Sequence, residues 1–131
     1  MKELRSLLRT EIGLNPSEIE RFIEKLVIKH VPPKQELIQV GAVARGIYFI
    51  ESGLMRTYHL MDGKEITTYF ACDNQFISTY SSFIEQKPSF ETLETIAQSQ
   101  VYELTHTSLM ELYQESSKFE KLGRILAERN Y

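Results

Sequence analysis

The stretch FISTYSSFIEQKPSFETLE, from Phe76 to Glu94, is rich in hydroxyl side chains and carries one lysine, Lys87, among three glutamates. Hydroxyls and backbone N–H groups at the start of a helix can hold an anion without an arginine. This chemistry predicts a pocket for a small anion. The alternative is that the hydroxyls only cap a short helix whose Tyr80 and Phe83 pack inward. The hydroxyl cluster comprises Ser78, Thr79, Ser81, Ser82 and Ser89.

Two further side chains lie in strand-like segments upstream of this cluster. Alternation along a strand could direct Thr57 and Tyr69 into the interior, where they would line a pocket or form ordinary cross-strand contacts. Arg56 would then point the opposite way. We expect it to be a surface cation or a partner of Glu65 across a hairpin, and not a ligand group.

Enzymatic and metal chemistry have little support in the sequence. His30, His59 and His106 stand far apart, and none has a second metal ligand at helical or strand spacing. The hydroxyl cluster has no histidine base beside it, so nucleophilic catalysis lacks a partner. Cys72 is the only cysteine, which excludes a disulfide framework and makes a reducing cytoplasm the expected location. We expect no enzyme, no metal and no cofactor.

The elements that would position these side chains begin with two helices over residues 2–26. Leucines and isoleucine at three and four spacing predict the first helix, and Gly13 ends it. The second helix has Asn15 as its cap, Pro16 at its first position and Glu18 to complete a capping box.

From residue 27 to 105 the pattern changes to short segments rich in β-branched and aromatic residues, about ten residues apart. The pair Asp62-Gly63 predicts a tight hairpin because both residues tolerate positive φ. Many short strands around one core predict a mainly β fold with flanking helices, a double-stranded β-helix or jelly roll.

The helical pattern returns at residues 107–115, where Ser108 and Glu111 suggest a capping box. A last helix over residues 116–131 carries apolar side chains on one face. These side chains are Phe119, Leu122, Ile125 and Leu126. With 131 residues, the chain is predicted to form a single domain.

The segment GIYFIESGLMRTYHLMDGKEITTYF resembles the sensor domain of the cyclic-AMP receptor and fumarate-nitrate regulator (Crp/Fnr) family. The similarity extends from about Val27 to Asn130. It implies a cyclic-nucleotide-binding-like β-roll that holds a small effector, and a last helix that pairs two copies into a homodimer. DNA would be read only by a helix-turn-helix domain that is absent from this chain. The chain would be a fragment of such a regulator or a free-standing sensor.

Family members that bind cyclic nucleotides carry a Gly-Glu pair and an Arg-Ser or Arg-Thr pair. Ser78 and Thr79 fall at the first pair in this sequence, and Ser89 and Phe90 fall at the second. Cyclic AMP binding is therefore doubtful, and the effector implied by the resemblance is unidentified. The candidate pocket becomes Ser78, Thr79, Tyr80, Ser81, Lys87, Ser89, Phe90, Thr57 and Tyr69. The alternative is a degenerate domain, with Phe90 filling the cavity, that serves only for dimerisation or protein interaction.

The net charge and the short apolar runs argue against two classes of partner, duplex DNA and membranes. The net charge is −3 and the basic residues are scattered, whereas proteins that bind duplex DNA usually carry a basic stripe. Apolar runs are only a few residues long, which predicts neither a membrane span nor an export signal.

Overall fold

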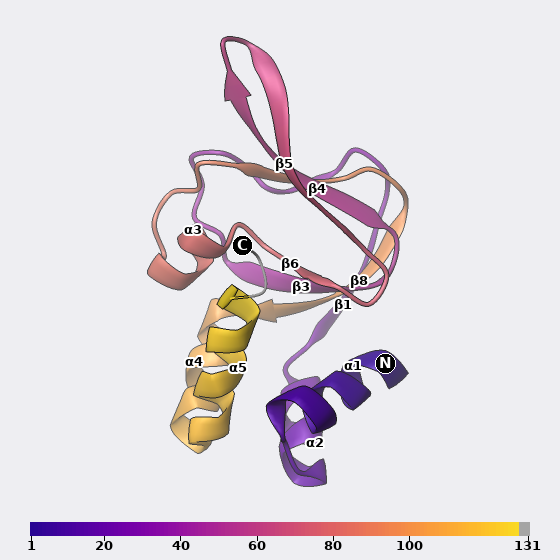
Figure 1. The fold of residues 1–131 in the computed structure, drawn as a ribbon, viewed down its shortest axis with the longest axis vertical. Helices are drawn as coiled ribbons and strands as arrows, with labels where there is room; N and C mark the ends of the chain where they lie inside the picture. Colours follow the sequence, from indigo (N-terminus) through magenta and orange to yellow (C-terminus); the bar gives the residue numbers. More distant parts are fainter. Residues whose placement is uncertain (129–131) are drawn as a thin grey trace.

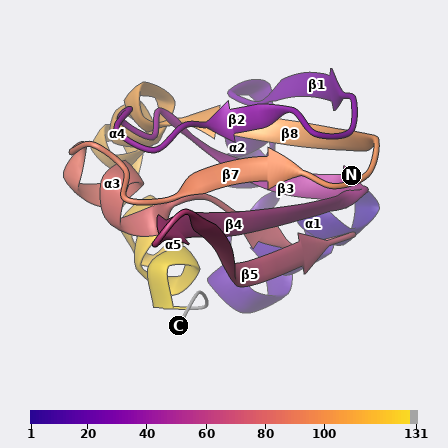
Figure 2. The same ribbon diagram turned by 90° about the horizontal axis from the view of Figure 1, so that it is seen from above.

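The computed structural model describes residues 1–128, and the part of the predicted last helix beyond Glu128 lies outside the described residues. Two four-stranded antiparallel sheets lie face to face and share one apolar core (Figures 1 and 2). The first sheet has the order β1 (Val27–Val31), β8 (Ser99–Thr105), β3 (Gly46–Ser52), β6 (Phe76–Ile77). The second has the order β2 (Glu36–Ile38), β7 (Thr92–Thr95), β4 (Leu54–Met61), β5 (Lys64–Cys72). The predicted jelly roll with flanking helices is confirmed.

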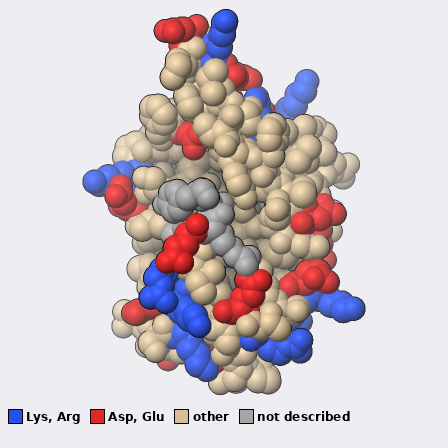
Figure 3. All heavy atoms as spheres, in the orientation of Figure 1, with Lys and Arg blue, Asp and Glu red and all other residues tan. Residues whose placement is uncertain are grey.

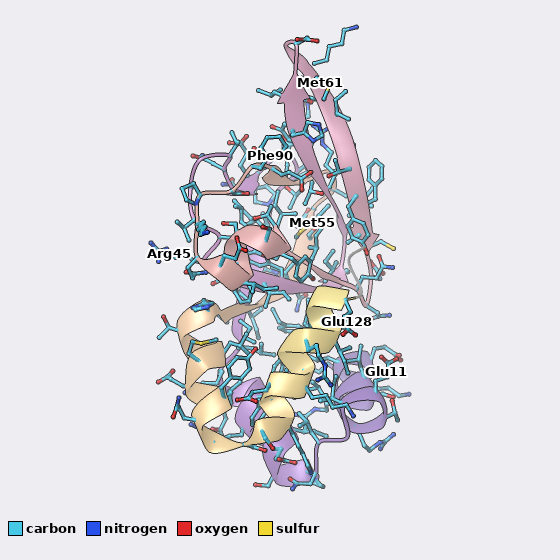
Figure 4. The ribbon with its side chains drawn as sticks, turned by 60° about the vertical axis from the view of Figure 1, so that its left-hand side comes forward. Glu11, Arg45, Met55, Met61, Phe90 and Glu128 are labelled. Carbon is cyan, nitrogen blue, oxygen red and sulfur yellow. The ribbon has the colours of Figure 1, made fainter. Side chains whose placement is uncertain are left out.

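The β4–β5 hairpin is the longest feature of the roll and projects beyond the body of the domain (Figures 1 and 4). Its turn uses Asp62 at φ 53° and Gly63 at φ 78°, as the sequence predicts. Near its base the register shifts, because Thr57 pairs with Tyr69 while Tyr58 pairs with Thr67. Thr68 is therefore the extra residue of a β-bulge, which no sequence pattern predicts.

The N-terminal helices follow their sequence signals closely. Helix α1 (Lys2–Leu7) continues into a π-helical turn, η1 (Leu8–Ile12), which ends at Gly13 with φ 81°. Helix α2 (Pro16–Glu24) begins with both halves of the Asn15–Glu18 capping box, at 2.9 and 2.8 Å. The sequence predicts the glycine stop, the cap and the position of the proline, and all three are confirmed.

Helix α4 (His106–Glu115) begins earlier than predicted. The Thr105 hydroxyl accepts a hydrogen bond from the Ser108 backbone N–H at 3.1 Å, so Thr105 is the cap and the predicted Ser108–Glu111 capping box is wrong. The reason is that strand β8 ends at Thr105 and the chain turns directly into the helix. Helix α5 (Ser117–Glu128) starts where the sequence predicts.

The apolar face of α5 packs against its own domain. Phe119, Leu122 and Leu126 are at most 3% exposed within the core, and only Ile125 of the predicted pairing residues is partly exposed. This packing buries three of the four side chains predicted to pair two copies, and the homodimer stays a prediction. Gly123 permits close packing of α5 on α4, because a Cβ there would lie 1.9 Å from the Tyr113 hydroxyl.

The surface does not form a stripe of one charge on the face shown in Figure 3. Basic and acidic side chains are interspersed around the helical end and at the hairpin tip. No helix among residues 1–128 has both the length and the apolar character that crossing a bilayer requires.

Candidate functional site

An inner cavity of about 300 Å³ lies between the base of the β4–β5 hairpin and α3 (Tyr80–Glu85). Volumes of this size can hold a small ligand. Strands β4 and β5 supply one wall, and the segment that leads from β6 into α3 supplies another. The lining residues are Thr57, Thr68, Tyr69, Ser78, Tyr80, Ser81 and Glu91.

An outer cavity of about 410 Å³ lies next to it, between α3 and the loop that precedes β7. The two cavities share Tyr80, Ser81 and Glu91, and we call them together the roll pocket. The structure thus brings all nine predicted pocket residues to one region. The residues that line only the outer cavity are Thr79, Ser82, Glu85, Lys87, Pro88, Ser89 and Phe90.

Three of the pocket hydroxyls are committed to the protein backbone. The Ser78 hydroxyl donates to the Gly46 carbonyl at 2.7 Å. The Ser82 hydroxyl accepts from the Ala44 N–H at 2.9 Å, and the Ser89 hydroxyl donates to the Glu91 carbonyl at 2.6 Å. These serines satisfy backbone groups where the chain turns, so their first role is to hold the pocket wall in shape.

Thr79 differs from these serines. Its side chain is 6% exposed, and its hydroxyl has no hydrogen-bond partner among the described residues. Although Thr79 is the residue before α3, it makes no side-chain cap bond. The expectation that this hydroxyl only caps the helix is therefore wrong. A buried hydroxyl without a partner is costly, which marks Thr79 as a group that a ligand could satisfy.

The hairpin bulge places a second set of hydroxyls in the inner cavity. The Thr57 and Thr68 hydroxyls lie 2.9 Å apart, and Thr68 also donates to a Glu91 carboxylate oxygen. Thr57 and Tyr69 are register partners across the hairpin, so both point to the same side of the sheet. Both side chains line the inner cavity and are also cross-strand partners, and a role for them in ligand binding stays a prediction.

Arg56 lies on the opposite face of the strand, as alternation predicts. Its guanidinium contacts Glu65 at 2.7 Å and Glu94 at 3.0 Å, and it stacks over the Tyr58 ring at 4.2 Å from the ring centre. The predicted pairing with Glu65 is confirmed. The carboxylates raise the pKa of Arg56, so this charge is held outside the roll pocket.

Phe90 does not fill the cavity. Its side chain is 74% exposed and its ring lies 5.3 Å from that of His59 (Figure 4). The hypothesis that Phe90 occupies the place of a nucleotide is therefore wrong for this structure. Lys87 is exposed at the outer cavity, and its backbone carbonyl accepts a hydrogen bond from Ser82.

A third space, the helix cavity, lies between α3 and the α4–α5 pair and measures about 420 Å³. Its walls are mostly apolar, and His106 contacts Phe83 edge to face at 5.5 Å. Burial, with a smaller effect from Arg45, lowers the pKa of His106. Tyr80 lines this cavity and both parts of the roll pocket, so one side chain connects the roll to the C-terminal helices.

Residues 28–116 match the family model of the cyclic nucleotide-binding domain, which is more than half of the chain. The chain belongs to this family. The resemblance based on the strand and turn motifs of the segment GIYFIESGLMRTYHLMDGKEITTYF is confirmed. No curated protein sequence matches the chain.

Solved structures with the same fold include bacterial regulators. The catabolite activator protein of Thermus thermophilus is similar with a TM-score of 0.77 and 17% identity over 89% of this chain and 55% of that one. The sensor domain of the regulator DNR from Pseudomonas aeruginosa is similar with a TM-score of 0.76 and 17% identity, over 98% of this chain and 89% of that one. A Eubacterium rectale protein, named as a regulator of the Crp/Fnr family, is similar with a TM-score of 0.75 and 22% identity, over 94% of this chain and 57% of that one. This chain therefore spans little more than half of two of these proteins.

Sequence reasoning missed Thr68 and Glu91, which line the roll pocket, and His59, which lies beside Glu91. Thr68 enters through the bulge, which has no sequence signature. Glu91 follows Phe90 directly in the hydroxyl-rich stretch, so its position was available in the sequence. His59 lies close only because the loop before β7 folds back along β4, and its Nδ1 is 3.7 Å from a Glu91 oxygen.

Proposed function

We propose that this chain is the effector-sensing domain of a Crp/Fnr-like transcription regulator. The observation that carries the proposal is a roll pocket that stays open and contains the buried Thr79 hydroxyl without a partner among the described residues. A domain kept only for protein contact has no need to retain such a costly group. The family membership and the likeness to regulator sensor domains support the same function.

The effector differs from cyclic AMP in this proposal. Among residues 1–128, no arginine lines either cavity, and Ser78, Thr79, Ser89 and Phe90 stand at the positions of the family motif. A charge-assisted hydrogen bond contributes about 1.5–3 kcal/mol, so losing the arginine alone weakens phosphate binding by about ten- to a hundred-fold. The lost ribose acceptor adds to this effect.

Signal transfer would run through Tyr80 to the C-terminal helices. A ligand that contacts Tyr80 in the roll pocket changes the packing of the same side chain in the helix cavity. In one state, helix α5 would stay packed on its own domain. In the other, it would move away and expose its apolar side chains for a homodimer. These side chains are Phe119, Leu122, Ile125 and Leu126. We place DNA binding in a separate helix-turn-helix domain of a longer cytoplasmic regulator.

Thermal unfolding in the presence of ligands tests the sensing function. A ligand that binds only the folded state raises the unfolding midpoint by mass action. We expect at least one class in a panel of small anions, cations, neutral polyols and cyclic nucleotides to raise it. The matched control is Ser81→Trp, which places a large side chain at an exposed position that both cavities share and should abolish the rise.

The failure of every class would favour the degenerate alternative, in which the domain serves only dimerisation or protein contact. A rise that Ser81→Trp leaves unchanged would place the ligand outside the roll pocket. Sedimentation of the chain with and without the active ligand then measures whether pairing changes.

A further inference from the structure

We propose that the roll pocket binds a small organic cation with an amine or guanidine group, held by the Glu91 carboxylate. This inference rests on the proposed sensing function and names the chemical class of its effector. It reverses the charge that a cyclic nucleotide-binding domain would be expected to accept.

The first observation is the charge of the inner cavity. Among the described residues that line it, Glu91 is the one charged side chain, and the others carry hydroxyl groups. In the outer cavity Lys87 is balanced by Glu85, which leaves Glu91 again in excess. Like charges repel, so this pocket disfavours a phosphate and attracts a cation.

The second observation is a contrast between neighbouring carboxylates. Glu94 is 19% exposed and forms an ion pair with Arg56 at 3.0 Å. Glu91 is 26% exposed, yet among the described residues no lysine or arginine pairs with it. The His59 Nδ1 lies 3.7 Å from a Glu91 carboxylate oxygen, beyond hydrogen-bond distance. Partly buried carboxylates are usually paired, so Glu91 is suited to receive an external N–H donor.

The third observation is that Glu91 is fixed in position. Thr68 donates to one carboxylate oxygen, and Thr68 is in turn held by the Thr57 hydroxyl at 2.9 Å. A carboxylate held in this way loses little side-chain entropy when a ligand arrives. The hairpin bulge that introduces Thr68 is thus part of the binding geometry.

The remaining wall suits the rest of such a ligand. Tyr69 and Tyr80 offer aromatic rings, which attract cations and pack against apolar carbon atoms. The unpartnered Thr79 hydroxyl can bond to a polar atom at the other end of the molecule. The geometry points to a ligand with a cationic head toward Glu91 and a polar group toward Thr79.

Matched probes of equal shape test this assignment. We would titrate the ¹⁵N-labelled chain with benzylamine, benzyl alcohol and benzoate, and with agmatine as a guanidine probe. We expect saturable shifts of the amide signals of Ser81 and Glu91 with the two cations. Benzyl alcohol should bind at least about tenfold more weakly, and benzoate more weakly still.

Two variants sharpen the titration. Glu91→Gln keeps the shape and the hydrogen bond from Thr68, and should weaken cation binding by about 10- to 100-fold. Glu111→Gln removes an exposed carboxylate on α4, away from the pocket, and should leave binding unchanged. Unfolding midpoints of both variants show whether the fold is intact.

The outcomes separate this inference from the sensing function. If benzoate or benzyl alcohol binds as well as benzylamine at these amides, or if Glu91→Gln binds the cations as well as wild type does, the cation assignment is overturned and sensing stands. If no cation gives saturable shifts up to about 10 mM, the cation assignment fails. Sensing falls as well only if the wider ligand panel produces no rise in the unfolding midpoint.

Discussion

The roll pocket and the helical end of the domain use the same chain in opposite ways. In the helical end, Phe119 and Leu122 are at most 1% exposed and lie in an apolar core shared with the N-terminal helices. In the roll pocket, buried side chains are polar, and one of them, the Thr79 hydroxyl, lacks a partner among residues 1–128. The contrast teaches that the helical end is packed with apolar side chains, whereas the roll pocket keeps a buried polar group that a ligand could satisfy.

Truncation in the helical end should give the largest effect. Phe119→Ala removes a fully buried ring, and we expect the free energy of unfolding to fall by about 3–5 kcal/mol. Ile125→Ala, on the partly exposed side of the same helix, should cost less than about 1.5 kcal/mol. Urea denaturation monitored by circular dichroism measures both. Equal costs would mean that α5 does not pack on its own domain in solution, and the contrast between the two regions would fail.

The second effect concerns a serine that supports the pocket wall. Ser82→Ala leaves the buried Ala44 N–H without its acceptor, and we expect a loss of about 1–3 kcal/mol in the same denaturation measurement. Ser81→Ala, at the exposed neighbouring position, should change stability by less than about 0.5 kcal/mol. If both substitutions were neutral, the serines would not hold the wall.

Thr79→Val should act in the opposite direction. The substitution keeps the shape and removes a buried hydroxyl that has no partner among the described residues, so the ligand-free domain should gain about 1 kcal/mol. The same variant should show a smaller ligand-induced rise in the unfolding midpoint. Destabilisation by Thr79→Val would show that the hydroxyl is already satisfied within the folded chain.

The smallest effect is a pH dependence that arises in the helix cavity. Burial lowers the pKa of His106 in the folded state below its ordinary value of 6.5, so the unfolded chain binds the proton more readily. Stability should therefore fall as pH drops below about 6.5 toward the folded-state pKa. The measurement compares unfolding midpoints of wild type and His106→Gln between about pH 7.5 and pH 5.5. An unchanged slope in the variant would assign the pH dependence to other groups.

Much of the fold could be predicted because its signals are local. The Asn15 cap, the Gly13 stop and the Asp62-Gly63 turn each depend on a few adjacent residues whose conformational preferences decide the outcome. Alternation placed Thr57 and Arg56 on opposite faces of their strand for the same reason. The cap at Thr105 was missed because the end of strand β8, a tertiary feature, fixes where the helix begins.

The site was predictable in its location and not in its chemistry. The hydroxyl-rich stretch marked the pocket, but sequence alone could not separate Ser78 and Ser82, which bond to the backbone, from Thr79, which does not. Nor could it foresee that Phe90 points outward, because that depends on how the loop before β7 packs. The bulge at Thr68 changed which residues face Glu91, and bulges arise from long-range pairing.

The central claim is that this cyclic nucleotide-binding domain has a pocket whose charge disfavours cyclic phosphates. Isothermal titration of the chain with cyclic AMP at low salt tests it most directly, since low salt strengthens any attraction to the phosphate. We predict no saturable binding below about 1 mM, which corresponds to about −4 kcal/mol. A dissociation constant in the micromolar range that Ser81→Trp abolishes would contradict the claim and would place the phosphate in the roll pocket despite Glu91.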